Sequence, residues 1–230
     1  MKTSDPQIVN NMIINKLRVT SILTCIILLA SCGIRQRKVA GFTETELALI
    51  HGSDSIMRVL TIDDLADLSV LRAKSSDLPD SVLMSDEFAR LAELMVATVT
   101  HPSQDGVGIA GPQVGLNRRV IAVQRFDKKG EPFEVYPNVR IVWASDSLAA
   151  GPEGCLSVPD RRGDVLRSQE IVIEYADIAG VEQSRQEIRL ESCGCAKPVP
   201  MVRDTVSGFT AVIFQHEIDH LDGVLYIDRI

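Results

Sequence analysis

The stretch Gln215-His216-Glu217-Ile218-Asp219-His220, close to the carboxyl end of the chain, decides how the fold is interpreted. Side chains four residues apart share one face of a helix, so His216 and His220 can direct two imidazole nitrogens at one metal ion, with Glu217 beside a water molecule. The apolar positions from Phe209 through Leu221 suit a buried helix. The spacing therefore predicts a buried metal-binding helix near the end of the chain.

A catalytic metal site needs a third protein ligand, and the segment after this motif supplies none in two common protease patterns. One pattern takes a glutamate further along the chain, but no Glu follows Glu217. In the pattern HExxHxxGxxH, Gly223 fits, but Tyr226 stands at the position of the last histidine. The third ligand must therefore come from an upstream residue.

The segments before the metal helix combine helical and strand patterns. Ser85 is suited to cap a helix, with His101-Pro102 as its stop, and the apolar positions between them recur at three- and four-residue spacing: Phe88, Leu91, Leu94, Met95 and Val99. Strands are expected at residues 120–123, 133–136, 139–143, 165–176 and 187–190. This order predicts an α+β fold with mixed or antiparallel strands packed around the C-terminal HExxH helix.

Composition bounds the class of protein. Of the 230 residues, 45% are hydrophobic, 24% charged and 4% aromatic, which is typical of a globular domain with an aliphatic core. The formal net charge of -7 leaves no global basic field to hold a polyanion, so nucleic acid is not expected as a partner.

The first residues have the layout of a secretory signal. Basic residues precede an apolar run from Val19 to Ala30, which is shorter than the roughly 18 to 20 residues that span a bilayer. The ending Leu29-Ala30-Ser31-Cys32 resembles the lipobox of bacterial lipoproteins, which implies a diacylglyceryl group on Cys32. We therefore expect a signal peptide over residues 1–31, a tether over 32–56 and a catalytic domain over 57–230. The expected location is the membrane surface facing the periplasm, or the cytoplasm if the signal is not used.

The cysteines narrow the search for the third metal ligand. Cys25 leaves with the signal and Cys32 carries the lipid, so the candidates in the mature chain are Cys155, Cys193 and Cys195. Cys193 and Cys195 could pair with each other, bind metal or stay free.

Three separated motifs, taken together, resemble the signatures of peptide deformylases, in the order of that family. They are GVGIAGPQVG at 106–115, EGCLS at 153–157 and QHEIDH at 215–220. The resemblance covers roughly residues 57–230. It implies a metal-dependent hydrolase that removes the N-formyl group from formyl-methionyl peptides and releases formate. We expect the chain to be a monomer.

The resemblance also implies a role for each matching residue. Cys155, His216 and His220 match the metal ligands, and Glu217 matches the general base. Gln113 and the backbone N–H of Leu156 match the groups that stabilise the oxyanion. The family typically uses Fe(II), while a thiolate with two imidazoles also suits Zn, Ni or Co.

The substrate-binding residues follow in the same way. Gly108 matches the position where the substrate backbone passes the first motif, and glycine permits that approach. The residues expected to line the methionine pocket or to lie near it are Val107, Phe209, Val212, Ile213 and Arg167. Two other interpretations stay open, a non-catalytic lipoprotein that binds metal or formylated peptides, and a metallopeptidase.

Overall fold

The computed structural model describes residues 41–178 and 198–230. The expected signal peptide, Cys32, the strand at 187–190 and the Cys193/Cys195 pair lie outside these ranges. None of the helices in the described part is both long and apolar enough to span a bilayer.

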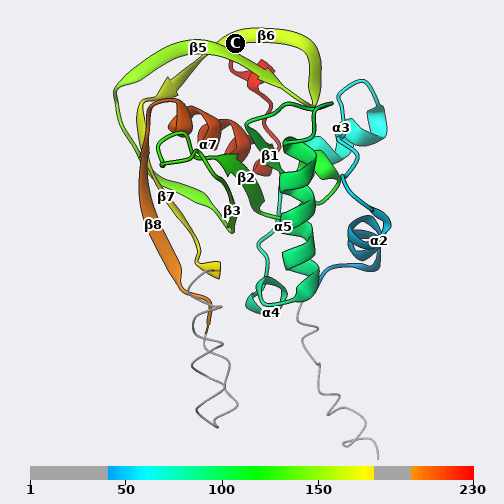
Figure 1. Cartoon of the computed structure of the whole chain (residues 1–230). Coiled ribbons are helices and arrows are strands. Elements are labelled where there is room, and N and C mark those ends of the chain that lie inside the picture. Colours follow the sequence, from blue (N-terminus) through cyan, green and yellow to red (C-terminus); the bar gives the residue numbers. More distant parts are fainter. Residues whose placement is uncertain (1–40, 179–197) are drawn as a thin grey trace, which may run out of the picture. The chain divides into compact units, whose positions relative to one another are not determined.

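Along the described chain, a run of helices is followed by a run of antiparallel strands, and helix α7 comes after the last strand (Figure 1). The helices are α2 (Glu44–Gly52), α3 (Leu65–Leu71), α4 (Asp80–Leu83), α5 (Asp86–Val99) and α7 (Gly208–Leu221), with 3-10 turns η1 (Gly111–Val114) and η2 (Tyr226–Asp228). The strands are β1 (Gly108–Ala110), β2 (Val120–Gln124), β3 (Phe133–Pro137), β4 (Arg140–Ala144), β5 (Leu148–Cys155), β6 (Val158–Ser168), β7 (Glu170–Ala176) and β8 (Met201–Ser207).

The strands form three antiparallel sheets, in the orders β1-β2-β3, β4-β7-β8 and β5-β6. Helix α7 contacts strands of all three sheets, and in Figure 1 the β5-β6 hairpin arches over it. The expected α+β fold around a C-terminal helix is confirmed.

Strand β2 explains how the first sheet is held between two helices. Its sequence Val120-Ile121-Ala122-Val123 is apolar on both faces, and all four residues are fully buried. Because side chains alternate along a strand, Ile121 and Val123 pack in one hydrophobic cluster with residues of α7. Val120 and Ala122 pack in the other cluster with residues of α5. A continuous apolar run is what a strand buried on both faces requires.

Helix α7 begins directly after β8 and is fixed along its length. Gly208, its first residue, has φ of 62°, a left-handed conformation that glycine adopts without strain. Gln215 accepts a hydrogen bond from the backbone N–H of Ser168 on β6 (3.0 Å) and donates to its carbonyl oxygen (2.8 Å). These two hydrogen bonds fix the rotation of α7 against β6, and with it the direction of the histidines that follow.

Helix α5 matches the helix expected from the sequence. The Ser85 hydroxyl accepts from the N–H of Phe88 (3.2 Å), and the helix ends at Val99. All five predicted apolar positions are buried.

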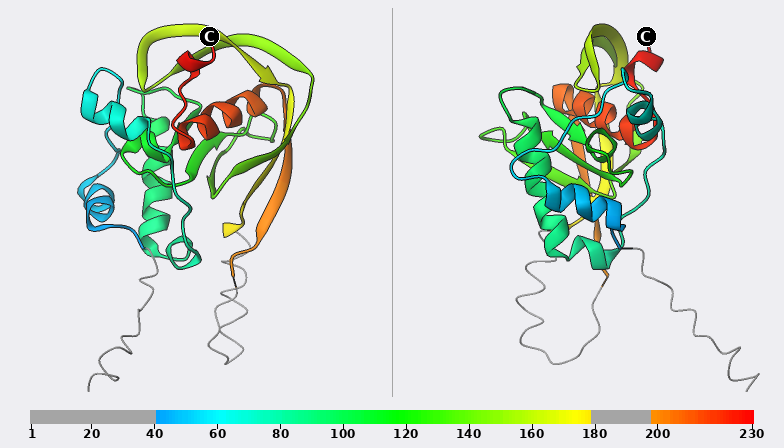
Figure 2. Two further views of the ribbon diagram at one scale, coloured as in Figure 1. Left: turned by 180° about the vertical axis from the view of Figure 1, so that it is seen from behind. Right: turned by 90° about the vertical axis from the view of Figure 1, so that its right-hand side faces the viewer.

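The predicted tether over residues 32–56 is wrong for residues 44–52, which form α2. Thr43 and Glu46 make a reciprocal capping box, and Ile50 is completely buried. Glu46 also forms an ion pair with Arg118 at 2.6 Å. Figure 2 shows α2 beside α5, so the compact domain begins before residue 57.

The single strand expected at 165–176 is two strands. The pairing partner changes at Gln169, because β6 pairs with β5 while β7 pairs with β4 and β8. Sequence patterning missed β1, β5 and β8. Strand β5 contains Gly151, Pro152 and Gly154, which have low strand propensity, and its long antiparallel partner β6 compensates for this.

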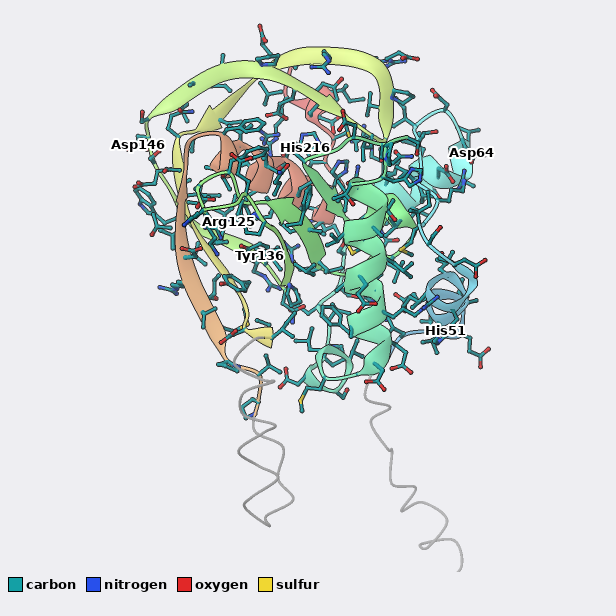
Figure 3. The ribbon with its side chains drawn as sticks, viewed as in Figure 1. His51, Asp64, Arg125, Tyr136, Asp146 and His216 are labelled. Carbon is teal, nitrogen blue, oxygen red and sulfur yellow. The ribbon has the colours of Figure 1, made fainter. Side chains whose placement is uncertain are left out.

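A buried cation ties the first sheet to the second. Arg125 is 2% exposed and donates to the Tyr136 hydroxyl (2.5 Å) and to Asp204 of β8 (2.9 Å). Asp127 completes the cluster at 2.6 Å. Arg125 and Tyr136 are neighbours in Figure 3. This cluster is structural and makes no contact with the histidine motif of α7 in the described contacts.

Candidate metal centre and active site

Three ligand atoms from two elements converge. Cys155 ends strand β5, and His216 and His220 lie one turn apart on α7. One ligand atom of each lies within 4.8 Å of the others, and Cys155 Sγ is 3.2 Å from His220 Nε2. One thiolate and two imidazoles form a donor set suited to a borderline-soft divalent cation, so the residues present fit the metal that the sequence implies.

His216 is oriented from behind by a buried carboxylate. Its Nδ1 is 2.8 Å from Glu153 Oε2, which leaves Nε2 free to face the other ligands. Burial raises the pKa of Glu153, but its bonds to Arg167 and His216 outweigh burial and lower the pKa to about 2. Glu153 is therefore a permanent anion beside the imidazole.

Arg167 lies behind the ligands rather than in the pocket lining, which corrects its expected role in substrate binding. The side chain is 4% exposed and contacts Glu153 at 2.7 Å and Asp219 at 2.6 Å. Asp219 in turn accepts from Arg229 at 2.5 Å. Glu153 and Asp219 lie in the sequence motifs at 153–157 and 215–220, but only the folded chain shows that Arg167 contacts both of them.

Glu217 is buried beside the ligands and against the first motif. A Cβ atom on Gly108 would lie 2.5 Å from Glu217 Oε1, so glycine is what allows the carboxylate to approach. Burial raises the pKa of Glu217 to about 7, with a smaller contribution from the negative charge of Glu153. Glu217 Oε2 and His220 Nδ1 are buried and have no hydrogen-bond partner among the described residues. An unpartnered carboxylate oxygen beside three ligand atoms fits a site that handles water and a cation.

Gln113 is fixed with its amide nitrogen toward the same point. Its Oε1 accepts from the backbone N–H of Ala110 (2.8 Å), so Nε2 faces Ser157 Oγ (3.2 Å) and Cys155 Sγ (3.6 Å). The segment before α3 ties the two motifs together, because Leu60 donates to the carbonyl of Gln113 and Ile62 to that of Ser157. The Gln113 amide and the Cys155 sulfur are thus tied to the same neighbouring segment.

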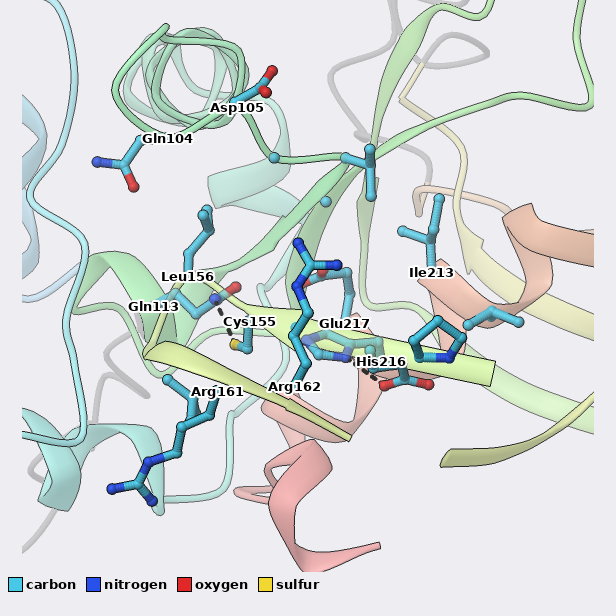
Figure 4. Close-up of a pocket in the computed structure, with 18 of the residues that line it drawn as sticks. Gln104, Asp105, Gln113, Cys155, Leu156, Arg161, Arg162, Ile213, His216 and Glu217 are labelled. Carbon is cyan, nitrogen blue, oxygen red and sulfur yellow. Dashed lines mark hydrogen bonds and ion pairs between the residues drawn. The ribbon is translucent and has the colours of Figure 1, made fainter. Parts of the chain in front are cut away.

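A pocket of about 860 Å³ opens onto these groups (Figure 4). The predicted residues that line it are Val107, Gly108, Gln113, Cys155, Leu156, Phe209, Val212, Ile213, His216 and Glu217. Every predicted site residue in the described ranges lines this pocket except Arg167 and His220. His220 still joins the cluster through its 3.2 Å contact with Cys155 Sγ. The lining also includes residues that the sequence did not single out, among them Asp105, Arg161 and Arg162.

The sequence matches the family described as polypeptide deformylase over residues 56–195 and 199–230. The chain belongs to the peptide deformylase family. Peptide deformylase 2 of Gloeobacter violaceus is 38% identical over 172 residues, covering 74% of this chain and 79% of the relative. The peptide deformylase of Caulobacter sp. is 35% identical over 179 residues, covering 76% and 88%.

Solved structures agree with the sequence relatives. A class I type b peptide deformylase from Acinetobacter baumannii bound to Met-Ala-Ser has a TM-score of 0.61 and 31% identity, covering 76% of this chain and 98% of that one. The peptide deformylase from Thermotoga maritima has a TM-score of 0.60 and 28% identity, covering 77% and 99%. The predicted family and enzymatic class are confirmed: the chain is a metal-dependent hydrolase that removes the N-formyl group from formylated peptides. The non-catalytic and metallopeptidase interpretations are not favoured.

Proposed function

We propose that Cys155, His216 and His220 hold one Fe(II) ion and that the site releases formate from formyl-methionyl peptides. One observation carries the proposal: the pocket is lined by the Glu217 carboxylate, the Gln113 amide and two members of the Cys155/His216/His220 cluster, Cys155 and His216. A bound divalent cation supplies Lewis-acid chemistry at the formyl carbonyl and at the attacking water. The donor set accepts Zn, Ni or Co as well, so metal analysis must decide the ion.

Glu217 is the proposed general base and acid. It takes a proton from the attacking water and returns it to the amine nitrogen of methionine as the bond to the formyl carbon breaks. A pKa of about 7 suits both steps, because the group can accept and release a proton near neutral pH. Gly108 leaves free the space that the Glu217 carboxylate occupies.

Gln113 and the backbone N–H of Leu156 are the proposed donors to the oxyanion that develops on the formyl oxygen. The bond from Ala110 orients the Gln113 amide before substrate arrives, so little reorganisation is needed during the reaction. Val107, Phe209, Val212 and Ile213 supply an apolar wall for the methionine side chain.

We further propose that the chain is exported, anchored by a lipid on Cys32 and monomeric. The basic residues, the short apolar run and the Leu-Ala-Ser-Cys ending support the export proposal. An exported site is separated from nascent chains, so its substrates would be formylated peptides outside the cytoplasm. Fractionation and lipid labelling of the full chain against Cys32→Ser test this, and an unlipidated cytosolic chain would refute it.

The activity test is formate release from formyl-Met-Ala-Ser by the full chain in detergent. The protein is loaded without oxygen with Fe(II), Zn, Ni or Co, and bound metal is measured for each. Glu217→Gln serves as the control because it keeps the size of the side chain. We expect release that is lost in the variant at equal metal content. One bound metal per chain without release from any form would refute the proposed function.

A further inference from the structure

Two arginines at the pocket differ from every other arginine in the described ranges. Arg161 and Arg162 follow the turn of the β5-β6 hairpin, are exposed and have no hydrogen-bond or ion-pair partner among the described residues. The other ten arginines of those ranges each donate to a carboxylate or carbonyl oxygen. Acidic residues outnumber basic ones, 31 to 24, so the lack of a partner at the pocket is not explained by a shortage of anions.

The two side chains take different directions. In Figure 4, Arg162 extends across the pocket toward Glu217, while Arg161 points away from it. A Cβ atom on Gly154 would lie 3.7 Å from Arg162 Cγ and 3.8 Å from its Nε, so the Arg162 stem passes over the residue just before the ligand Cys155. The guanidinium of Arg162 is therefore available at the pocket, and none of its donors has a partner among residues 41–178 and 198–230.

The anionic groups of the lining complete the electrostatic picture. Asp105 lies across the pocket from the arginines in Figure 4, and Asp160 directly precedes Arg161. The negative charge of Glu153 is balanced by its buried ion pair with Arg167. The pocket thus has a cationic side at β6 and an anionic side at Asp105, which gives a bound peptide a preferred distribution of charge.

We propose that Arg162 is a specificity residue that binds a carboxylate on the second or third residue of the substrate. This inference rests on the proposed function, in which the formyl group faces Glu217 and the methionine side chain faces the apolar wall. The rest of the peptide must then leave through the opening beside Arg162. A guanidinium with free donors matches a carboxylate in bidentate geometry. That carboxylate is either an acidic side chain or the free C-terminus of a short peptide.

Matched peptides separate the two sources. Formyl-Met-Ala-Asp-amide against formyl-Met-Ala-Asn-amide, and the same pair at the second residue, test the side chain. Formyl-Met-Ala-Ser as free acid against its amide tests the C-terminus. We expect the acidic member of at least one pair to have about a five- to tenfold higher kcat/KM, mainly through KM, because the contact exists before and during the reaction. The preference should shrink with added salt.

Arg162→Ala should bring the acidic-to-neutral ratio close to one. Arg161→Ala removes the same charge from the neighbouring position and should retain most of the preference. As a second measurement, unformylated Met-Ala-Asp-amide should inhibit the parent protein more strongly than Met-Ala-Asn-amide, and Arg162→Ala should abolish the difference. Equal rates for all pairs in the parent protein, or a preference that survives Arg162→Ala, would overturn the inference while the neutral peptides still release formate. Formate release from no peptide would instead count against the proposed function.

Discussion

Replacing Glu153 by glutamine should weaken metal binding before it abolishes folding. The carboxylate accepts three charge-assisted bonds, from Arg167 Nε (2.7 Å), Arg167 Nη2 (3.0 Å) and His216 Nδ1 (2.8 Å). A glutamine of the same shape offers one acceptor and one donor group, so at least one of these donors would face another donor. Arg167, 4% exposed, would keep only Asp219 as an anionic partner.

The size of the effect follows from these contacts. Breaking a buried ion pair on one side costs about 3–5 kcal/mol, since it leaves an uncompensated charge. Loss of the partner that orients a metal-binding histidine typically lowers metal affinity about 10- to 100-fold. We therefore expect Glu153→Gln to fold with lower stability and to lose metal to a chelator at a lower concentration.

The assay is competition between the protein and a chelator, followed by the thiolate charge-transfer band of the Co(II) form, with urea unfolding of the metal-free protein beside it. Asp204→Asn is the matched control because it removes an anion from the buried Arg125 cluster, away from the histidines. That variant should lose stability but keep its metal affinity. Unchanged metal affinity in Glu153→Gln would refute the orienting role.

Three further predictions concern the first motif and the N-terminal helix. Gly108→Ala should lower kcat about 100-fold at full metal content, since its Cβ would displace Glu217 by occupying a point 2.5 Å from Oε1; a normal kcat would contradict the contact. Gln113→Ala should lower kcat about 10²- to 10³-fold through loss of an oxyanion donor, measured as formate release per bound metal. Burial alone raises the pKa of Glu46, but hydrogen bonds from Arg118 and Thr43 outweigh it and lower the pKa. Its stabilisation is therefore present above the unfolded pKa of about 4.3 and is lost as pH falls through the lower folded value. Urea unfolding of Glu46→Gln should accordingly show a shallower loss of stability in acid than the parent, and parallel curves would exclude this role.

The sequence predicted elements whose signal is local. Helix α5 carries a cap, a regular apolar stripe and a stop within one segment, and β2 is an uninterrupted apolar run. The two histidines of α7 needed only the period of a helix to share a face. Cys155 could not be singled out by spacing, and the resemblance of three motifs to a family supplied it.

The remaining elements depend on contacts outside their own segment. Strand β5 contains glycine and proline and is specified by its pairing with β6. Helix α2 has a weak apolar pattern, and the Arg118 ion pair and the burial of Ile50 fix it to the domain. Arg118 lies 72 positions from Glu46, and β5 is specified by a partner strand, so the residues of either element alone do not contain the signal.

The same distinction separates the two kinds of residue in the site. Residues that we propose to contact the reacting groups, such as Glu217 and Gln113, stand inside short motifs because the proposed chemistry restricts their identity. The proposed roles of Arg167 and Arg162 depend instead on where the β5-β6 hairpin places them. Arg167 contacts Glu153 behind His216, and Arg162 lies over Gly154 at the pocket. Strand β6 delivers both from one long strand, one buried and one exposed. A change in the hairpin alone could therefore alter substrate preference while the ligand set and its buried support stay intact, which is why Arg162, rather than the metal site, is where we expect this chain to differ in the peptides it selects.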